Sequence, residues 1–316
     1  MARRRSEFDV TNSVNTTEPT AVRGEINRIY VGLYPNGSTS ALTRAFADCT
    51  RLYQGRYPGY RACDTAYHNL QHTLDVGLAM ARLMDGYERS SERAEPLGAR
   101  LFSFGVITAL FHDIGYLRHR HDTRHQNGAE YTLRHVSRGG RFLEDYMREL
   151  GMADLAQVAS RIIHFTGYEM PVSEIDVPNA TFRRLGHMLG SADILAQMAD
   201  RCYLEKCHDR LYPEFVAGGL AQPAEGPNPA TVRFTSADDL MRKTPAFYAV
   251  ASHRLNELLG AAYAYASTHF GGQNLYLDEV DKNIQHAQRV AGLTDVRVLL
   301  RRVPPTSVTG QQLAAA

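Results

Sequence analysis

Apolar residues recur along most of the chain at the three- and four-residue spacing of an amphipathic helix. Residues 21–34 show the pattern clearly, with Val22, Ile26 and Leu33 on one stripe that Pro35 and Gly37 end. Alternation typical of strands is almost absent, so the pattern predicts an all-α fold. Further helices are expected over residues 40–53, 65–87, 97–111, 128–136, 141–150, 153–165, 181–211, 237–270 and 277–290.

The two ends of the chain differ from this pattern. Residues 1–20 are rich in Thr, Asn, Ser and Glu and carry few large apolar groups, which predicts a disordered lead-in. Residues 303–316, with Pro304-Pro305 and a closing run of alanines, predict a flexible tail. Between them we expect one helical domain over residues 21–300, with its C-terminal helices over 237–290.

Composition narrows the choice of partners. The 316 residues include 35 basic and 34 acidic side chains, so no global field attracts a nucleic acid polymer. No window approaches the roughly 18 apolar residues that span a bilayer, so no membrane partner is expected. The four cysteines show no CxxC spacing and are too few to stabilise a chain of this size by disulfide bonds. This favours free thiols and a cytoplasmic location.

Several histidines and carboxylates stand where the pattern predicts buried helix. His68 and His72 lie four residues apart, on one face of a helix. A single histidine is more often a surface or core residue than a ligand, but unpaired buried polar groups cost roughly 1–3 kcal/mol each. A shared divalent metal would satisfy them together. The other residues placed in this way are His112, Asp113, His164 and Asp193.

The order of these histidines and aspartates along the chain resembles that of a known protein family. The order His72, His112-Asp113, His125, His164, Asp193 is similar to that of the HD superfamily of metal-dependent phosphohydrolases, over residues 65–200. The element Tyr67-His68-Asn69-x-x-His72-x-x-Asp75-Val76 resembles the signature of class I cyclic nucleotide phosphodiesterases. The resemblance implies an HD-domain helical bundle with additional N- and C-terminal helices and a metal-binding core over about residues 65–212. It also implies that His68 is a general acid and that His72, His112, Asp113 and Asp193 hold the first metal.

The chain departs from the phosphodiesterase pattern after its His-Asp pair. Ile114-Gly115-Tyr116 and a basic loop replace the expected His-Pro-Gly. His125-x-x-Gly128-Ala129-Glu130 looks more like bacterial HD enzymes, in which further histidines bind a second metal. That match implies that His125 and His164 complete a two-metal site with Asp113 bridging, and His119 and His121 stay open as alternatives to His125.

The chemistry of such a site explains the residue types. Two divalent transition-metal ions lower the pKa of a shared water and bind phosphoryl oxygens. Imidazole and carboxylate ligands suit manganese, iron, nickel or zinc, with magnesium an option at the second position. Asp113 would then join His68 as a catalytic residue. Candidates for substrate contact, against the alternative that they are ordinary surface groups, are Asn69, Arg118, Arg124, Gln197 and Arg201.

We therefore expect a metal-dependent phosphodiesterase that hydrolyses a 3′,5′-cyclic nucleotide or a related cyclic phosphodiester. A nucleotide phosphomonoesterase with the same metals is the near alternative. An HD-fold di-iron oxygenase is the alternative from another class, because the same ordered ligands serve oxygen chemistry there. A small-molecule nucleotide is the expected partner, and the Ala-rich C-terminal helices could form a homodimer surface or cover the pocket.

Overall fold

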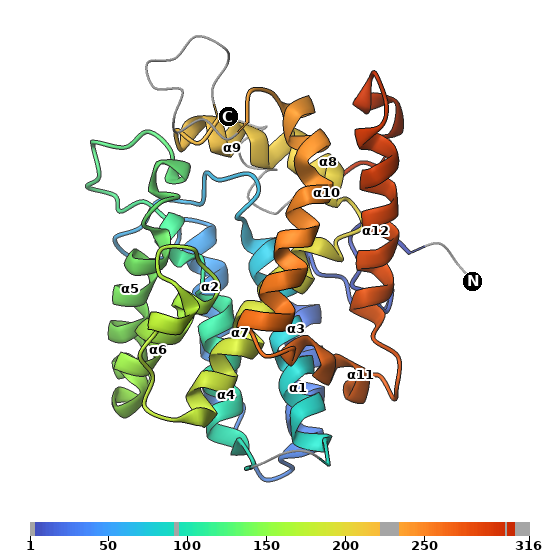
Figure 1. Cartoon of the computed structure of the whole chain (residues 1–316). Helices are drawn as coiled ribbons and strands as arrows, with labels where there is room; N and C mark the ends of the chain where they lie inside the picture. The colour runs from blue at the N-terminus through green and yellow to red at the C-terminus, as the bar shows by residue number, and fades with distance from the viewer. Residues whose placement is uncertain (1–3, 92–94, 222–233, 301, 307–316) are drawn as a thin grey trace.

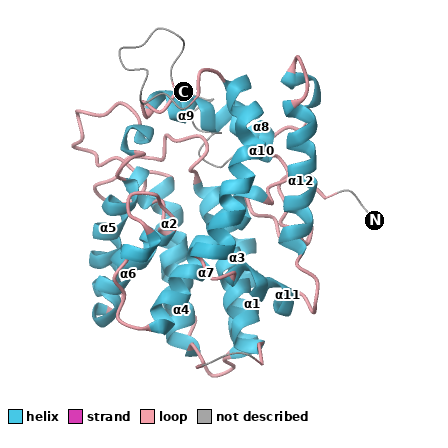
Figure 2. Cartoon of the chain, in the orientation of Figure 1, coloured by secondary structure: helices cyan, strands magenta, loops and turns pink. Residues whose placement is uncertain are grey.

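Helices make up nearly all the regular structure of the computed structural model, which describes residues 4–91, 95–221, 234–300 and 302–306 (Figure 2). Within those residues, β-structure is limited to isolated bridges, so the predicted all-α fold is confirmed. The longer helices are α1 (Pro19–Leu33), α2 (Ser40–Tyr53), α3 (Leu70–Arg89), α4 (Gly98–Leu110), α5 (His135–Glu149), α6 (Ala156–Ile162), α7 (Ala180–Met198), α10 (Ala237–His253) and α12 (Leu275–Ala291). The short ones are η1 (Ile114–Tyr116), η2 (Gly128–Tyr131), η3 (Ala153–Leu155), η4 (Ile163–Phe165), η5 (Val172–Glu174), α8 (Tyr203–Lys206), η6 (Cys207–Leu211), α9 (Tyr212–Ala217), η8 (Arg254–Leu258), η9 (Ala262–Ala264), α11 (Tyr265–His269) and η10 (Val296–Leu299).

The helix α3 runs through the middle of the molecule. It packs against α1, α4, α7 and α11, and nearly all its side chains are buried (Figure 1). Its polar residues are enclosed with partners: Asp85 accepts from His269, and Arg82 pairs with Asp9 and donates to the Tyr276 hydroxyl. A helix with charged residues on several faces is therefore a core helix here, because distant segments supply its partners.

The N-terminal segment corrects one prediction. Residues 1–20 are predicted to form a disordered lead-in, but residues 4–18 lie packed against the helices, while residues 1–3 lie outside the described part. Val14 is buried, and the Asp9 carboxylate pairs with buried Arg82. The polar composition hid this role because the segment is held mainly by ion pairs and hydrogen bonds, such as those from Arg4 to Ala199 and Glu279. Of the predicted flexible tail, residues 307–316 also lie outside the described part.

The start of α3 differs from the predicted helix over residues 65–87. The side chain of Asn69 accepts a hydrogen bond from the backbone of His72 and caps the helix, which begins at Leu70. His68 therefore precedes the helix instead of sharing its face with His72. The turn still brings the two rings to 5.9 Å between centroids.

Two glycines allow close approach between elements. A Cβ added at Gly86 would lie 1.8 Å from the carbonyl oxygen of Tyr265, so α11 can pack on α3 only because this side chain is missing. A Cβ added at Gly115 would lie 1.8 Å from the carbonyl oxygen of His135. This contact sets η1 directly against the first turn of α5.

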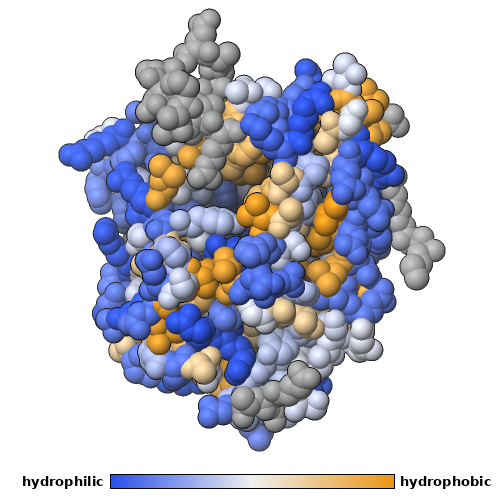
Figure 3. Space-filling view, in the orientation of Figure 1, coloured by the Kyte–Doolittle hydropathy of each residue, from blue (hydrophilic) through white to orange (hydrophobic). Residues whose placement is uncertain are grey.

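The surface is mostly hydrophilic on the face shown in Figure 3, with apolar residues in small scattered groups. Among the described helices, none combines the length and apolar composition needed to cross a bilayer. The four cysteines are buried free thiols, as predicted.

Candidate metal centre

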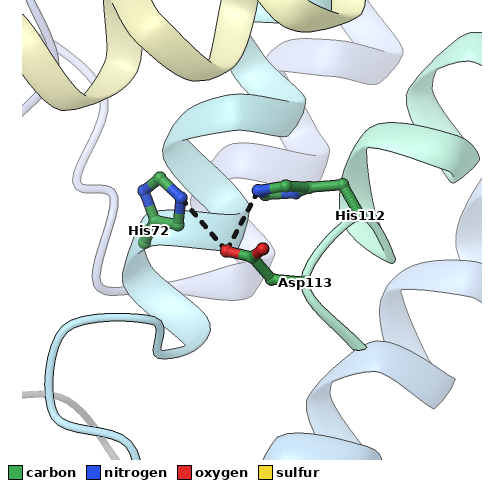
Figure 4. A group of neighbouring side chains, drawn as sticks. All are labelled: His72, His112 and Asp113. Atoms are coloured by element: carbon green, nitrogen blue, oxygen red, sulfur yellow. Dashed lines mark ion pairs between the residues drawn. The ribbon is translucent and has the colours of Figure 1, made fainter. Parts of the chain in front are cut away.

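Four side chains from three helical segments converge at the centre of the molecule, and we call them the four-residue cluster: His72, His112, Asp113 and Asp193. His72 lies in the first turn of α3, His112 and Asp113 follow α4, and Asp193 lies within α7. The Nε2 atom of His72 is 3.3 Å from Asp113 Oδ2 and 3.3 Å from Asp193 Oδ1. The Nε2 atom of His112 is 3.1 Å and 3.7 Å from the same two oxygens. Figure 4 shows both imidazoles pointing at Asp113.

The tautomer of His112 shows what the cluster lacks. Its Nδ1 atom lies 2.8 Å from the carbonyl oxygen of Ala109 and must donate, since a carbonyl only accepts. In the neutral ring, Nε2 then carries a lone pair aimed at the Asp113 carboxylate. Both His112 Nε2 and Asp113 Oδ2 are buried without a hydrogen-bond partner. Two acceptors facing each other in the core require a positive charge between them.

The pKa values of His72 and His112 also show that the carboxylates of the cluster attract positive charge. Burial by itself would lower the pKa of His72, but the carboxylates of Asp113 and Asp193 outweigh it and raise the pKa to about 10. Burial likewise opposes protonation of His112, and Asp113 raises its pKa. Extra protons on the imidazoles are one way to supply the charge, and a divalent cation is the other. Two imidazoles and two carboxylates form a donor set typical of zinc, manganese or iron.

The second oxygen of Asp113 faces a histidine that the sequence did not single out. His135 Nε2, at the start of α5, lies 3.5 Å from Asp113 Oδ1. Its Nδ1 is 2.7 Å from the carbonyl oxygen of Thr132 and donates to it, so Nε2 again offers a lone pair. Burial lowers the pKa of His135, which keeps the ring neutral and able to bind a metal. Asp113 therefore stands between His72 and His112 on one side and His135 on the other.

His68 is held beside the cluster by a buried carboxylate. Its Nδ1 lies 2.6 Å from Glu214 Oε2, in α9. The other oxygen of Glu214 accepts from the backbone N–H groups of Tyr67 and His68. With Nδ1 committed to the carboxylate, Nε2 is the atom of His68 that can exchange a proton with a bound molecule.

An aromatic stack orients two of the imidazoles. The Tyr116 ring stacks on His68 at 4.4 Å between centroids and on His135 at 4.3 Å. Tyr116 lies in η1, immediately after the His112-Asp113 pair. The proton-carrying ring and the ring facing Asp113 Oδ1 are thereby fixed relative to each other.

The basic loop does not supply the predicted histidine ligand. His125 Nδ1 lies 3.0 Å from the Asp122 carboxylate, and its Nε2 is 2.8 Å from an Arg134 nitrogen. The alternatives His119 and His121 stack on each other instead. None of the three reaches the Asp113 carboxylate within ion-pair distance in the described structure, because the loop turns outward before η2.

His164 also lies apart from the four-residue cluster. It is partly buried in η4, which packs against α5 and α7. Its Nδ1 is buried without a hydrogen-bond partner among the described residues, and burial lowers its pKa. The described structure places neither Asp113 nor Asp193 within ion-pair distance of this ring. The predicted role of His164 as a metal ligand is therefore not built into this arrangement.

Most of the predicted substrate-binding residues have other contacts. The Asn69 side chain caps α3 and donates to Ala66, and the Arg118 guanidinium is engaged by the Asp64 carboxylate. Gln197 lies one turn after Asp193 on α7, and it opposes the effect of burial, which raises the pKa of the Tyr67 hydroxyl. Arg201 follows α7, and its carbonyl accepts from Arg302. Arg124 is exposed and lines a separate groove.

Three residues of the site were not predicted from the sequence: His135, Tyr116 and Glu214. His135 begins an amphipathic helix 22 positions after Asp113, a place where a capping or surface role is more usual. Tyr116 directly follows Ile114-Gly115, and this adjacency to the His-Asp pair was the available signal. No signal in the sequence pointed to Glu214, because it contacts His68 from 146 positions away along the chain.

We compared the chain with protein-family models, with curated proteins and with solved structures, and none of these comparisons gave a match. Support for a function therefore comes from the geometry of the four-residue cluster and from the motif around His68.

Proposed function

We propose that the protein is a metal-dependent phosphohydrolase of the HD type, and specifically a phosphodiesterase acting on a 3′,5′-cyclic nucleotide or a related cyclic phosphodiester. The observation that carries the proposal is the hydrogen-bonded pair His68–Glu214 beside the four-residue cluster. A proton donor next to a group of buried metal-type ligands is the arrangement that phosphoester cleavage requires.

One divalent ion would be held by His72, His112 and Asp113, whose ligand atoms lie within 4.8 Å of one another, with Asp193 as a fourth ligand from α7. A second ion would be held by Asp113 Oδ1 and His135, in place of the predicted His125. When bound, such ions supply positive charge for the phosphoryl oxygens and acidify water near neutral pH. Manganese, iron, nickel or zinc suits these ligands, and magnesium suits the second position.

The chain's own residues account for the proton that the leaving oxygen needs. Glu214 accepts from Nδ1–H of His68 and leaves Nε2 as the atom that can give up a proton, and the ring lies 5.9 Å from that of His72 between centroids. Tyr116 keeps the ring in place by stacking. As water adds to phosphorus and the bond from phosphorus to the ester oxygen breaks, His68 donates its Nε2 proton to the departing oxygen.

The alternatives differ from the phosphodiesterase in their substrate or in the metal and oxidant that they need. A phosphomonoesterase acting on 5′-mononucleotides needs the same proton donor, so only the substrate distinguishes it. A di-iron oxygenase needs two irons and dioxygen, and hydrolysis without oxygen excludes that chemistry as the explanation of turnover. The Tyr67-His68-Asn69 element favours the phosphodiesterase.

The test is a substrate panel under anaerobic conditions. The manganese-loaded protein is incubated with cyclic AMP, cyclic GMP and 5′-mononucleotides, and products are separated by chromatography. We expect ring opening of a cyclic nucleotide to the 5′-monophosphate. Release of inorganic phosphate from mononucleotides alone would assign the phosphomonoesterase activity instead.

The control is His68→Ala in the same assay. We expect turnover to fall by about 10²-fold or more while the bound metal content stays unchanged, because His68 is not among the ligands. Unchanged turnover would remove His68 from the mechanism.

A further inference from the structure

A groove of about 810 Å³ lies between the basic loop of residues 117–125 and the exposed side of α5. None of the four cluster residues lines it, nor do His68 or His135. Its volume is in the range of sites for small molecules of nucleotide size. It is therefore a space separate from the candidate metal centre.

The groove carries unbalanced positive charge. Arg124 and Arg141 line it, and both are exposed and without a carboxylate partner within 4 Å among the described residues. Two of the acidic side chains at its rim are engaged by other arginines: Asp145 pairs with Arg148, and Glu149 pairs with Arg44. Guanidinium forks left free in this way match phosphate oxygens.

The remaining acidic side chain of the lining, Asp122, is hydrogen-bonded within the protein. The Asp122 carboxylate accepts from the Tyr131 hydroxyl and contacts His125. Arg138, a fixed part of the wall, donates to the carbonyl oxygens of Gly115 and Leu117 and lies over the Tyr131 ring at 3.3 Å. The wall is thus preorganised by protein contacts, and Arg124 and Arg141 remain for a ligand.

A column of planar rings ends in the same groove. Tyr60 packs on His119 at 4.4 Å between centroids, and His119 stacks on His121 at 5.2 Å with 17° between the planes. His121 is exposed and lines the groove, so a further planar ring can reach it. A nucleobase is such a ring, and stacking of this kind tolerates any base.

We propose that this groove is a second binding site, for a nucleoside phosphate, whose phosphates are held by Arg124 and Arg141 and whose base stacks on His121. The proposal does not depend on the proposed function, because no metal ligand and no residue assigned to catalysis lines the groove.

The test is equilibrium binding by isothermal titration calorimetry on the full chain in EDTA, so that no metal ion recruits phosphate to the cluster. The probes are ADP, adenosine and inorganic pyrophosphate. We expect ADP to bind more tightly than adenosine. In R124Q/R141Q the dissociation constants of ADP and of pyrophosphate should both rise about tenfold or more.

Two further variants separate stacking from general charge effects. His121→Ala should weaken ADP about tenfold and leave pyrophosphate within about twofold, since only ADP carries a base. Arg289→Gln removes one exposed positive charge from α12 and should leave all three affinities unchanged. The proposal is overturned if ADP binds no better than adenosine, or if R124Q/R141Q binds ADP as the unchanged chain does.

Discussion

At the scale of single residues, the hydrogen bond from His112 Nδ1 to Ala109 decides how the cluster must be interpreted. It leaves a lone pair on Nε2 facing a carboxylate in a buried space, and the same arrangement recurs at His135. In the neutral rings, both Nε2 atoms face Asp113 from its two sides, as metal ligands do. The positive charge that Asp113 attracts is then supplied either by a further proton on the rings or by a bound cation.

Glu214→Gln tests the positioning of the proton donor. The substitution replaces the carboxylate that accepts from His68 Nδ1–H with an amide and so disturbs the positioning of the proton donor. Turnover of a cyclic nucleotide should therefore fall by about 10–10²-fold with metal content unchanged. Steady-state kinetics should place the loss in kcat and leave KM nearly unaffected. A p-nitrophenyl phosphodiester, whose leaving group needs no proton, should be hydrolysed almost normally. Equal losses on both substrates would show that Glu214 serves only the fold.

Asp75→Asn tests a partly buried carboxyl one turn after His72 on α3. Burial raises the pKa of Asp75 to about 7, with Lys206 opposing the shift. Between about pH 4 and pH 7, Asp75 is deprotonated in the unfolded chain but keeps its proton in the folded chain. The free energy of unfolding therefore falls as pH rises through this range. Above about pH 7 this group causes no further change.

Urea denaturation at pH 4.5 and pH 8 measures the effect. Relative to the unchanged chain, Asp75→Asn should be more stable at pH 8 by on the order of 3 kcal/mol and closer to it at pH 4.5. Parallel pH profiles for the two proteins would contradict the assignment.

At the scale of elements, the site depends on how closely short segments pack. The turn η1 carries Asp113 at its start and lies against the first turn of α5, which carries His135. Gly115 makes that approach possible. The spacing between the two sides of the Asp113 carboxylate is therefore set by one missing side chain.

Gly115→Ala should push η1 and α5 apart, because the added methyl group would overlap the His135 carbonyl. We expect a lower melting temperature and manganese binding weakened about tenfold or more. Gly24→Ala, at an exposed position of α1 with open space around it, is the matched control. It should stabilise the chain by about 0.5–1 kcal/mol without changing metal binding. Unaltered metal affinity in Gly115→Ala would show that the contact does not position the ligands.

The helices were readable from the sequence because burial imposes a period of 3.6 residues. The range predicted for residues 40–53 matches α2 at both ends, and His72, His112, Asp113 and Asp193 stood out as polar groups in apolar surroundings. What periodicity could not show were contacts between distant segments. His135 and Glu214 are ordinary residues until the fold sets them against Asp113 and His68, and the Asn69 cap moved the start of α3 past His68.

At the scale of the whole molecule, the ends of the chain take part in the core that supports the site. The N-terminal segment crosses α3, where Asp9 pairs with Arg82, and the Tyr276 hydroxyl of α12 also accepts from Arg82. Arg82 is 1% exposed. The central helix thus depends on a charge supplied by residues that composition marked as a disordered lead-in.

Removing either member of this pair should cost much more than removing a surface pair. Asp9→Ala leaves a buried guanidinium without its carboxylate and should lower the free energy of unfolding by about 3 kcal/mol or more. The double variant Asp9→Ala/Arg82→Met should lose less than the sum of the two single variants, measured by urea denaturation. Arg28→Ala, which breaks an exposed pair with Glu25, should cost under about 1 kcal/mol. Additive losses at Asp9 and Arg82 would contradict a coupled buried pair.

The central claim is that the four converging side chains of the cluster, three of them buried and Asp193 partly exposed, share a divalent ion. Diffraction from crystals of the manganese-loaded full chain, recorded for anomalous scattering from manganese, tests it most directly. We predict a peak bonded to the Nε2 atoms of His72 and His112 and to carboxylate oxygens of Asp113 and Asp193. Direct contact between these side chains with no anomalous peak among them, in crystals grown with excess manganese, would contradict it.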